Sequence, residues 1–396
     1  VHKTDHFGEL VCSNSLKSTK PESAAGMLKS ELAALHSHLY DFANTYAVPA
    51  GGALAVDREA FGRAITHAIE ASPLIEVVRE EVTDLASVAR GAAAVIVASG
   101  PLTSDALAQD LLTLTGEDYL AFYDAAAPIV MADSLDFDKL FMQSRYEDAT
   151  DSSPGDYVNA AFTREEYDEF ITELVEAERV IAKSFETKEL FSACQPIEEI
   201  ARKGHDAPRF GTLKPVGLTD PRTGKRPWAV LQLRAEDKEA QSYNLVGFQT
   251  NLTFGEQKRV FRMIPGLENA EFARFGVMHR NTFIDAPRLL NSSLLLVGGQ
   301  ASQLDAPVFV AGQLAGTEGY VEAIRSGLHA ALEVCAYLRH IATPQLPKTT
   351  AFGSLLAYAT DPQTVDYQPM HVNFGIIEPL EQRIKNKGER YRAYAK

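Results

Sequence analysis

The sequence predicts an α/β protein in which a doubly wound domain, made from both ends of the chain, is interrupted by an α+β insertion. Ala94–Ala98 and Val308–Ala311 are unbroken apolar runs, and each is followed by a glycine turn and a helical pattern. This order is typical of buried parallel strands in doubly wound units. Between them, amphipathic and alternating patterns indicate a different architecture. We place the first domain at 1–104 and 300–396 and the insertion at 105–299.

The N-terminal part contains helices and short strands. Leucines at three- and four-residue spacings predict a helix over Ala24–Tyr46. Leu54–Val56 has the composition of a short strand. Asp57 then occupies the position of an N-cap, which predicts a helix from Arg58 to about Glu70.

Further elements complete the first domain. Leu74–Val78 and Val82–Ala86 are strand candidates, and Ala94–Ala98 is expected to be covered on both faces. A helix is expected to begin at Ser104. After the second glycine turn, a long helix is expected over Tyr320–Leu338.

The middle of the chain has the patterns of an α+β unit. Glu165–Lys188 is a charged amphipathic segment that predicts a helix. Trp228–Leu233 and Tyr243–Gln249 predict antiparallel strands joined by the polar loop Ala235–Gln241. Pro344–Thr350 has the composition of a short linker before the C-terminal segment.

Composition limits the class of protein. In 396 residues, 45% are hydrophobic and 23% charged, as in ordinary globular proteins. We expect no membrane span, because no apolar run reaches roughly 18 residues, and no secretory signal, because the first residues are polar. The three cysteines lie far apart without CxxC spacing. That pattern argues against a disulfide framework and a metal site, and it favours a reducing, cytoplasmic compartment.

Charge is unevenly distributed along the chain. The net charge of −15 argues against a polyanionic partner. Acidic residues dominate 131–189, however, whereas basic residues dominate 202–234, and further basic residues occupy 258–288 and the C-terminal tail. Such charge runs are more often solvated faces than nucleic-acid sites. Charge alone therefore does not establish an RNA interface.

The glycine-rich segment after Val308–Ala311 is the strongest candidate for a ligand site. A helix N-terminus directly follows a buried strand there, and glycines allow a planar ligand to approach the backbone. An isoalloxazine ring that becomes anionic on reduction suits this position. The alternative is a turn that only packs. The residues concerned are Gly312, Gln313, Gly316, Glu318, Gly319 and Tyr320.

Two cysteines are candidates for chemistry. Cys12 is followed by three polar residues, and Cys194 precedes Pro196 and a predicted helix start, where a thiol can become a reactive thiolate. The alternative for each is a small buried hydrophobic residue, which is the commoner case. Cys335 lies among apolar residues of the last long helix, and we expect it in the core. His279 lies in a His-Arg-Asn triplet that could meet a ring or an anion.

Together these stretches resemble the folate- and FAD-dependent tRNA (uracil-5-)-methyltransferases, relatives of the glucose-inhibited-division flavoproteins. The resemblance runs through nearly the whole chain. It is most specific in Glu9–Leu16, Val48–Asp57, Gly116–Pro128, Lys214–Pro227, Gly255–Phe283, Phe309–Gly327 and Tyr367–Gly375.

The resemblance implies a Rossmann-like FAD-binding domain interrupted by an α+β insertion domain. It also implies methylation of C5 of a T-loop uridine in tRNA, with methylenetetrahydrofolate as carbon donor and NADH or NADPH supplying electrons through FAD. Uracil C5 is a weak nucleophile until a thiolate adds at C6, which explains the need for cysteines. The target base is normally folded within its loop and would have to be extruded.

Residue roles follow from the matched segments. Cys194 would attack C6 and Cys12 would be the proton-transfer partner, although the two roles could be exchanged. His279 would stack on the pterin or the nicotinamide. The flavin would be framed by Ser99, Gly100, Gly312, Gln313, Gly316, Glu318, Gly319 and Tyr320. Contacts to tRNA would come from Arg222, Lys225, Arg226, Arg274 and Arg280.

One departure from the family pattern affects these expectations. The family begins with a βαβ unit carrying G-x-G-x-x-G, which this sequence lacks, so roughly thirty residues or more would be missing. Without them we expect an unpaired apolar sheet edge and a weaker phosphate anchor for FAD. The chain as given is then an inactive fragment of a full methyltransferase. The alternatives are a non-enzymatic tRNA-binding protein that has lost FAD and a flavin oxidoreductase acting on a small molecule.

Overall fold

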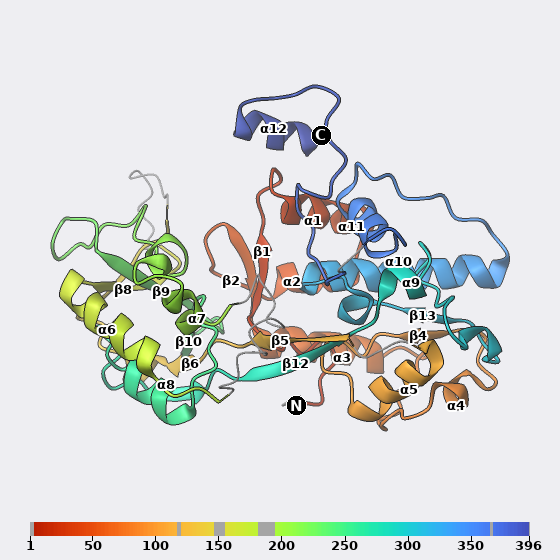
Figure 1. The fold of residues 1–396 in the computed structure, drawn as a ribbon, viewed down its shortest axis with the longest axis horizontal. Coiled ribbons are helices and arrows are strands. Elements are labelled where there is room, and N and C mark those ends of the chain that lie inside the picture. The colour runs from red at the N-terminus through yellow and green to blue at the C-terminus, as the bar shows by residue number, and fades with distance from the viewer. Residues whose placement is uncertain (1–3, 117–119, 146–154, 181–194, 365–366, 396) are drawn as a thin grey trace.

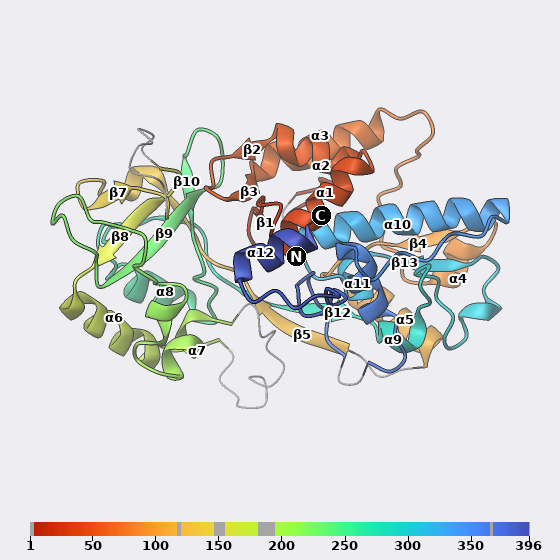
Figure 2. The same cartoon turned by 90° about the horizontal axis from the view of Figure 1, so that it is seen from above.

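The computed structural model describes residues 4–116, 120–145, 155–180, 195–364 and 367–395 (Figure 1). Its apolar side chains form two large cores. One core gathers residues from both ends of the chain, and the other gathers residues from the middle. The two cores lie at opposite ends of the molecule in both views (Figures 1 and 2).

The first core is enclosed by elements from the N- and C-terminal parts. Those of the N-terminal part are β1 (Ser15–Ser18), α1 (Ala24–Ala34), α2 (His38–Thr45), β2 (Ala47–Val48), β3 (Ala53–Val56), α3 (Arg58–Glu70), α4 (Leu85–Ala89), β4 (Val95–Val97) and α5 (Asp105–Thr115). Those of the C-terminal part are α9 (Ala286–Leu289), β13 (Val308–Val310), α10 (Tyr320–Arg339), α11 (Ala351–Ala359) and α12 (Lys387–Tyr394). Strands β4 and β13 pair in parallel, with Phe309 opposite Ile96.

Helix starts in this part follow local capping chemistry. The Asp57 carboxylate accepts a hydrogen bond from the Ala60 backbone N–H at 2.9 Å, and the Ser104 side chain accepts one from Leu107 N–H. Each cap satisfies an amide that the first turn of a helix leaves without an internal partner. The predicted starts of α3 and α5 are therefore confirmed.

The second core lies under a six-stranded antiparallel sheet in the order β11-β6-β10-β9-β8-β7. Its strands are β6 (Ile129–Met131), β7 (Leu140–Met142), β8 (Val158–Phe162), β9 (Ala229–Ala235), β10 (Ser242–Leu245) and β11 (Phe272–Arg274). Helices α6 (Arg164–Glu176), α7 (Ile197–Arg202) and α8 (Phe254–Phe261) contribute the rest. The predicted hairpin is confirmed, because β9 and β10 pair with Asn244 opposite Arg234.

A two-stranded ribbon joins the halves. β5 (Leu120–Ala125) and β12 (Met278–Phe283) pair antiparallel and run between the two cores (Figure 2). Leu107 and Ile284 belong to the first core although both lie inside the expected insertion of 105–299. We therefore propose that the insertion begins and ends at this ribbon.

Two predicted strands are absent. Leu74–Val78 forms no strand, and Leu74 and Val78 are 92% and 62% exposed, because its apolar residues face solvent rather than a core. Val82–Ala86 instead leads into α4, whose N-cap is Asp84. Short apolar runs do not by themselves distinguish strands from other structure.

Other elements differ in extent. The helix predicted over Ala24–Tyr46 is two helices, because the chain turns at His36 with a φ of +51° and Ser37 caps α2. Helix α6 ends at Glu176, and residues 181–188 of the predicted helix lie outside the described ranges.

Cys335 is exposed, so its expected core position is wrong. The end of α10 extends past the core, as its exposed Leu332 and Leu338 indicate.

The prediction that the strand at Ala94–Ala98, now β4, is covered on both faces is wrong. Ile96 is 40% exposed. Within the described residues β4 pairs only with β13. One edge of this short parallel sheet is therefore open.

Candidate functional site

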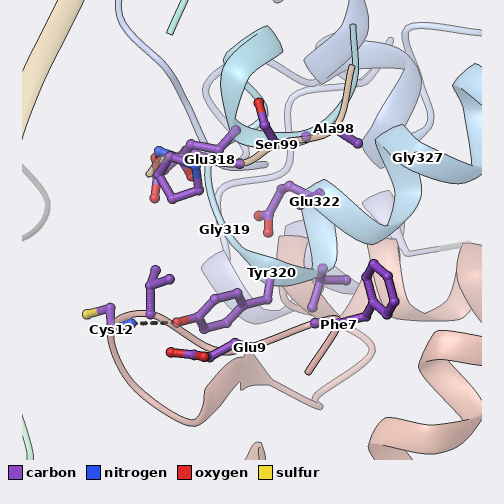
Figure 3. A pocket seen from close by; sticks show the side chains of 18 of the residues that line it. Phe7, Glu9, Cys12, Ala98, Ser99, Glu318, Gly319, Tyr320, Glu322 and Gly327 are labelled. Carbon is purple, nitrogen blue, oxygen red and sulfur yellow. Dashed lines mark hydrogen bonds between the residues drawn. The ribbon is translucent and has the colours of Figure 1, made fainter. Parts of the chain in front are cut away.

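A cavity of about 800 Å³ lies beside the N-terminus of α10. It is bounded by the N-terminal segment 4–17, by residues 98–101 after β4 and by residues 311–323 around the glycine turn (Figure 3). These three segments lie far apart in the sequence. The second and third meet because β4 and β13 are neighbours, and the first reaches α10 through Cys12 and Lys17. The predicted site residues that line it are Cys12, Ser99, Gly100, Gly312, Gln313, Glu318, Gly319 and Tyr320.

Two glycines of the turn are required by their surroundings. Gly319, the N-cap of α10, has a φ of +110°, and a Cβ there would lie 2.5 Å from Glu322 Oε2. Gly316 does not line the cavity. A Cβ on it would overlap the Tyr367 hydroxyl oxygen. Gly316 therefore allows the C-terminal segment to pack against the turn, whereas Gly319 opens the helix start to the cavity.

Hydrogen bonds fix the shape of the glycine turn. The Gly312 N–H donates to Ser326 Oγ at 3.0 Å, and the Thr317 hydroxyl donates to the Gly312 carbonyl at 2.8 Å. The Gln313 amide donates to Glu318. The turn is thus preorganised by its own side chains and by α10, so a ligand need not order it.

An ion pair between a partly exposed lysine and a buried carboxylate forms one wall of the cavity. Lys17 Nζ lies 3.2 Å from Glu322 Oε1, which also accepts a hydrogen bond from the Val372 N–H. Glu322 is 1% exposed, and its second oxygen, Oε2, has no hydrogen-bond partner in the described part of the chain. A buried carboxylate oxygen without a partner is costly, so this wall is suited to a ligand that carries an N–H or O–H donor.

Lys29 supports the same wall from behind. Its ammonium donates to the carbonyls of Leu16 and Ser18, at 2.5 and 3.0 Å, on either side of Lys17. Burial lowers the pKa of Lys29 to about 8, against the opposing effect of Glu322. Lys17 itself has a φ of +64°, a conformation that these hydrogen bonds hold in place.

Cys12 lies at the edge of the cavity on a tightly held loop. Its backbone N–H donates to the Tyr320 hydroxyl at 3.0 Å, and its thiol points away from the Tyr320 ring (Figure 3). Arg58 donates to the carbonyls of Leu10 and Cys12, and Arg274 Nη2 donates to the carbonyl of Val11 at 2.7 Å. Three consecutive peptide groups are therefore held by two guanidinium groups.

The charges near Cys12 are predominantly positive. Burial acts to lower the pKa of Arg58, but Glu236, 3.0 Å away, and neighbouring Tyr320 and Cys12 raise it above its ordinary value. The pKa of Arg274 is lowered by burial and by Arg58. Two partly buried cations thus face one loop, and the Glu236 carboxylate acts on the pKa of both. This environment stabilises negative charge at the Cys12 sulfur.

The interface between the two halves runs through the same loop. Asn14 is fully buried and donates to the carbonyls of Val56 and Ala235, while its own oxygen accepts from Arg234 Nε at 2.8 Å. Its contacts therefore join β3 to β9. The Cys12 loop is consequently fixed to both cores, and its position depends on how they pack.

The sequence prediction missed Arg58, Glu236, Lys17 and Glu322. The position of Arg58 in the first turn of the predicted helix α3 is a sequence feature that could have identified it. A cation is unfavourable near a helix N-terminus, so its presence there suggests another role. Glu236 and Glu322 meet their partners only across the fold, at sequence separations of 178 and 305 residues.

The remaining predicted site residues are dispersed. Cys194 lies outside the described residues, as do the side chains of His279 and Arg280, whose backbones belong to β12. Arg222 pairs with Asp220 at 2.9 Å. Lys225 and Arg226, on the same loop, have exposed side chains. Arg274 does not join them, because its guanidinium group lies beside the Cys12 loop.

Two further features of the described residues bear on the class of site. No group of three or more His, Cys, Asp or Glu side chains among them is arranged to hold a metal ion. None of their helices is both long and apolar enough to span a bilayer.

Solved structures confirm the predicted fold class. The chain resembles GidA of Aquifex aeolicus in its form II crystal with a TM-score of 0.65 at 15% identity, over 92% of this chain and 63% of that one. The form I crystal gives the same TM-score at 16% identity. At these identities the likeness concerns the fold, an α/β flavoprotein architecture of the GidA kind. The chain spans less than two thirds of GidA.

Several proteins are much more similar to this chain in sequence than GidA of Aquifex aeolicus is. The family model for glucose inhibited division protein A matches residues 1–342. The methylenetetrahydrofolate--tRNA-(uracil-5-)-methyltransferase TrmFO of Desulfitobacterium hafniense is 50% identical over 390 residues, 98% of this chain and 86% of that protein. TrmFO of Geobacter sulfurreducens is 51% identical over 392 residues, 99% of this chain and 87% of its own length. With these matches along nearly its whole length, the chain belongs to the glucose inhibited division protein A family and, within it, to the methylenetetrahydrofolate--tRNA-(uracil-5-)-methyltransferases.

Proposed function

We propose that this chain is the greater part of a flavin-dependent enzyme that methylates C5 of a uridine in the T-loop of tRNA. Methylenetetrahydrofolate would donate the carbon, and NADH or NADPH would donate the electrons. The relatives at about 50% identity carry the tRNA (uracil-5-)-methyltransferase name. The observation that carries the proposal to this chain is the placement of Cys12 at the edge of the cavity, beside Tyr320 and two partly buried guanidinium groups.

The cavity residues fit FAD. The backbone at Gly100 faces open space, since a Cβ there would have no atom within 4 Å, and Gly312 is nearly as open, because a Cβ on it would meet only Ala323 at 3.7 Å. The α10 N-terminus favours negative charge on a bound ring. Glu322 Oε2 offers an unused acceptor. When bound, FAD would supply the transfer of electrons and of the one-carbon unit.

The chain's own residues would activate the uracil. A thiolate, which we assign to Cys194, would form a bond to C6 and place a carbanion-like pair of electrons on C5. After C5 bonds to the one-carbon unit, a base must take the C5 proton as the bond between that carbon and its carrier nitrogen breaks. Hydride from the reduced nicotinamide then reaches the resulting methylene, and the C6–S bond breaks to release the thiolate. We assign this proton transfer to Cys12, because the positive charges of Arg58 and Arg274 stabilise its thiolate. The roles of the two cysteines could be exchanged.

Substrate contacts divide into two groups. Arg222, Lys225 and Arg226 lie on one exposed loop of the insertion and would meet phosphates outside the target loop. Arg274 lies beside Cys12 and would instead meet the target nucleotide itself. We retain Arg280 as a tRNA contact and His279 as the residue that stacks on the pterin or nicotinamide, and we expect the protein in the cytoplasm.

The test uses protein expressed from the complete gene. Its visible absorption spectrum should contain a flavin band, and isotope from labelled methylenetetrahydrofolate should appear in 5-methyluridine of a tRNA transcript when NADH or NADPH is present. A transcript with 5-fluorouridine at the target should form a covalent adduct with wild type but not with Cys194→Ala. Flavin binding without any transfer of label to tRNA would contradict the proposal. An adduct with Cys194→Ala would reverse the cysteine assignment.

A further inference from the structure

Three phenylalanine rings form a continuous stack that leads from the second core to solvent. Phe272 packs against that core, and its ring lies 5.0 Å from that of Phe275 at an interplanar angle of 13°. The Phe275 ring in turn lies 4.7 Å from that of Phe254 at 17°. Phe254 is the first residue of α8 and is 52% exposed. The outermost ring is thus held rigidly while about half of it remains in water.

The surroundings of the stack are open and carry a cation. A Cβ at Gly255, the residue after Phe254, would have no atom within 4 Å. Lys258 Nζ lies 5.6 Å from the Phe275 ring centroid, and its side chain is exposed. The neighbouring Arg259 is paired with Glu173 and Glu256, so it adds little net charge. Lys258 is therefore the cation placed to meet an anionic group beside the stack.

The stack is also connected to the loop that carries Cys12. Phe275 directly follows Arg274, which holds the Cys12 loop. Phe254 follows the segment 249–251, which binds the residues on either side of the undescribed range: Val180 N–H donates to the Asn251 carbonyl and Ile197 N–H to the Gln249 carbonyl. The link through Arg274 places the stack on the side of the insertion that meets the Cys12 loop.

A hydrophobic explanation accounts poorly for this arrangement. Burial would favour placing the Phe254 ring under the sheet, because an exposed ring leaves apolar surface in water. Near-parallel rings with a free outer face and an adjacent lysine are instead what proteins use to bind unpaired nucleobases, since every base has a flat face that can stack. RNA loops are recognised in this way after their bases are splayed out.

We propose that the outer face of Phe254 stacks on an unpaired base of the substrate RNA, next to the extruded target uridine, and that Lys258 contacts the adjoining phosphate. This inference rests on the proposed function, from which it takes the identity of the partner. It adds a specific nucleotide-binding position in the insertion, separate from the exposed loop of Arg222, Lys225 and Arg226. The stack thus helps keep the RNA loop open around the extruded uridine during the reaction.

The experiment compares four variants in protein expressed from the complete gene, with a T-arm hairpin RNA as the probe. Phe254→Ala should weaken binding on the order of ten-fold, as expected for the loss of one base–aromatic stack. Phe137→Ala is the matched control, because Phe137 is similarly exposed, at 48%, and has only an edge contact with Tyr243. It should bind as wild type does. Phe254→Trp should retain affinity.

The tryptophan variant gives a direct readout. Trp228 is the one tryptophan among these 396 residues, and the wild-type protein supplies the baseline emission. The additional emission in F254W should be quenched when the hairpin binds. In Lys258→Met, the slope of log Kd against log salt should fall by about one unit.

The outcomes separate the inference from the proposed function. Equal affinities of Phe254→Ala and Phe137→Ala, or emission of F254W that saturating hairpin does not change, would overturn the stacking inference even if wild type methylates the hairpin. Quenching in F254W together with no methylation by wild type would support the stack and contradict the proposed function.

Discussion

The Tyr320 hydroxyl accepts the backbone N–H of Cys12 at 3.0 Å, which joins the first residue of α10 to a loop 308 residues earlier in the chain. The same helix start carries the glycine turn and, within its first turn, Glu322. A single helix N-terminus therefore positions the cavity wall and the cysteine.

Removing this acceptor should impair catalysis more than cofactor binding. In Tyr320→Phe the Cys12 N–H loses its partner while the ring remains. We expect a loss of about 1–3 kcal/mol in stability and a lower kcat, with the flavin content of the purified protein retained. Urea unfolding and single-turnover methylation measure the two effects. An unchanged kcat would show that the hydrogen bond does not place Cys12.

The pair Arg58–Glu236 should be sensitive to removal of one partner. Arg58→Met leaves Glu236 buried without its cation, and such losses typically cost about 3–5 kcal/mol. Thiol alkylation of Cys12 at neutral pH should also slow, because a positive charge that stabilises the thiolate is lost. The exposed pair Arg63–Glu59 offers a control, since Arg63→Met should change stability by less than about 1 kcal/mol. Alkylation at the wild-type rate would contradict the assigned role of Arg58.

Glu198 should make stability depend on pH. It accepts hydrogen bonds from the Asn251 N–H and the Thr250 hydroxyl, but burial raises its pKa from 4.5 to about 7. Between these values the folded state binds more protons than the unfolded state, so the free energy of unfolding should fall as pH rises from about 4.5 to 7. The total change corresponds to about 3 kcal/mol for this shift.

Glu198→Gln should remove that slope. Urea unfolding at several pH values between 4.5 and 7 measures it against wild type. The matched control is Glu199→Gln, a neighbouring residue on α7 that pairs with Arg179 near the surface. If the wild-type slope persists in Glu198→Gln, another group is responsible.

The sequence predicted those parts of the fold that local chemistry determines. The caps at Asp57 and Ser104 and the strand–glycine–helix unit ending at Tyr320 follow from adjacent residues, and they are confirmed. Leu74–Val78 and Cys335 were misassigned because apolar composition does not indicate whether a core lies nearby. Burial is decided by the whole fold.

The cavity was predictable only where its residues form a local sequence pattern. Its glycine turn is a contiguous pattern, and Cys12 came from the family resemblance. Pairs such as Lys17–Glu322 and Arg58–Glu236 have no local pattern, since each joins residues that only the folded chain brings together. The neighbouring basic side chains of 202–234 likewise differ in role: Arg234 is buried against Asn14, whereas Lys225 is exposed.

Gly319→Ala should reduce flavin binding. The substitution forces a side chain into a φ of +110° and places its Cβ 2.5 Å from Glu322 Oε2 and 2.8 Å from Lys17 Nζ. The ion pair that forms the cavity wall must then move. We expect a flavin content well below wild type by absorbance, with the antiparallel sheet of the insertion unaffected by circular dichroism. Gly91→Ala is the control, because Gly91 also has a positive φ but no neighbour within 4 Å of a Cβ. It should retain flavin.

Cysteine substitutions should separate chemistry from structure. Cys12 is half-buried beside two guanidinium groups, whereas Cys335 is exposed near the end of α10. Cys12→Ala should therefore abolish methylation while leaving flavin absorbance and the affinity for T-arm RNA close to wild type, because its backbone contacts to Tyr320 and Arg58 do not involve the sulfur. Cys335→Ala should behave as wild type in all three measurements. A Cys12→Ala enzyme that still transfers the one-carbon unit at the wild-type rate would remove Cys12 from the mechanism, and proton transfer would then have to be assigned to another group near the cavity.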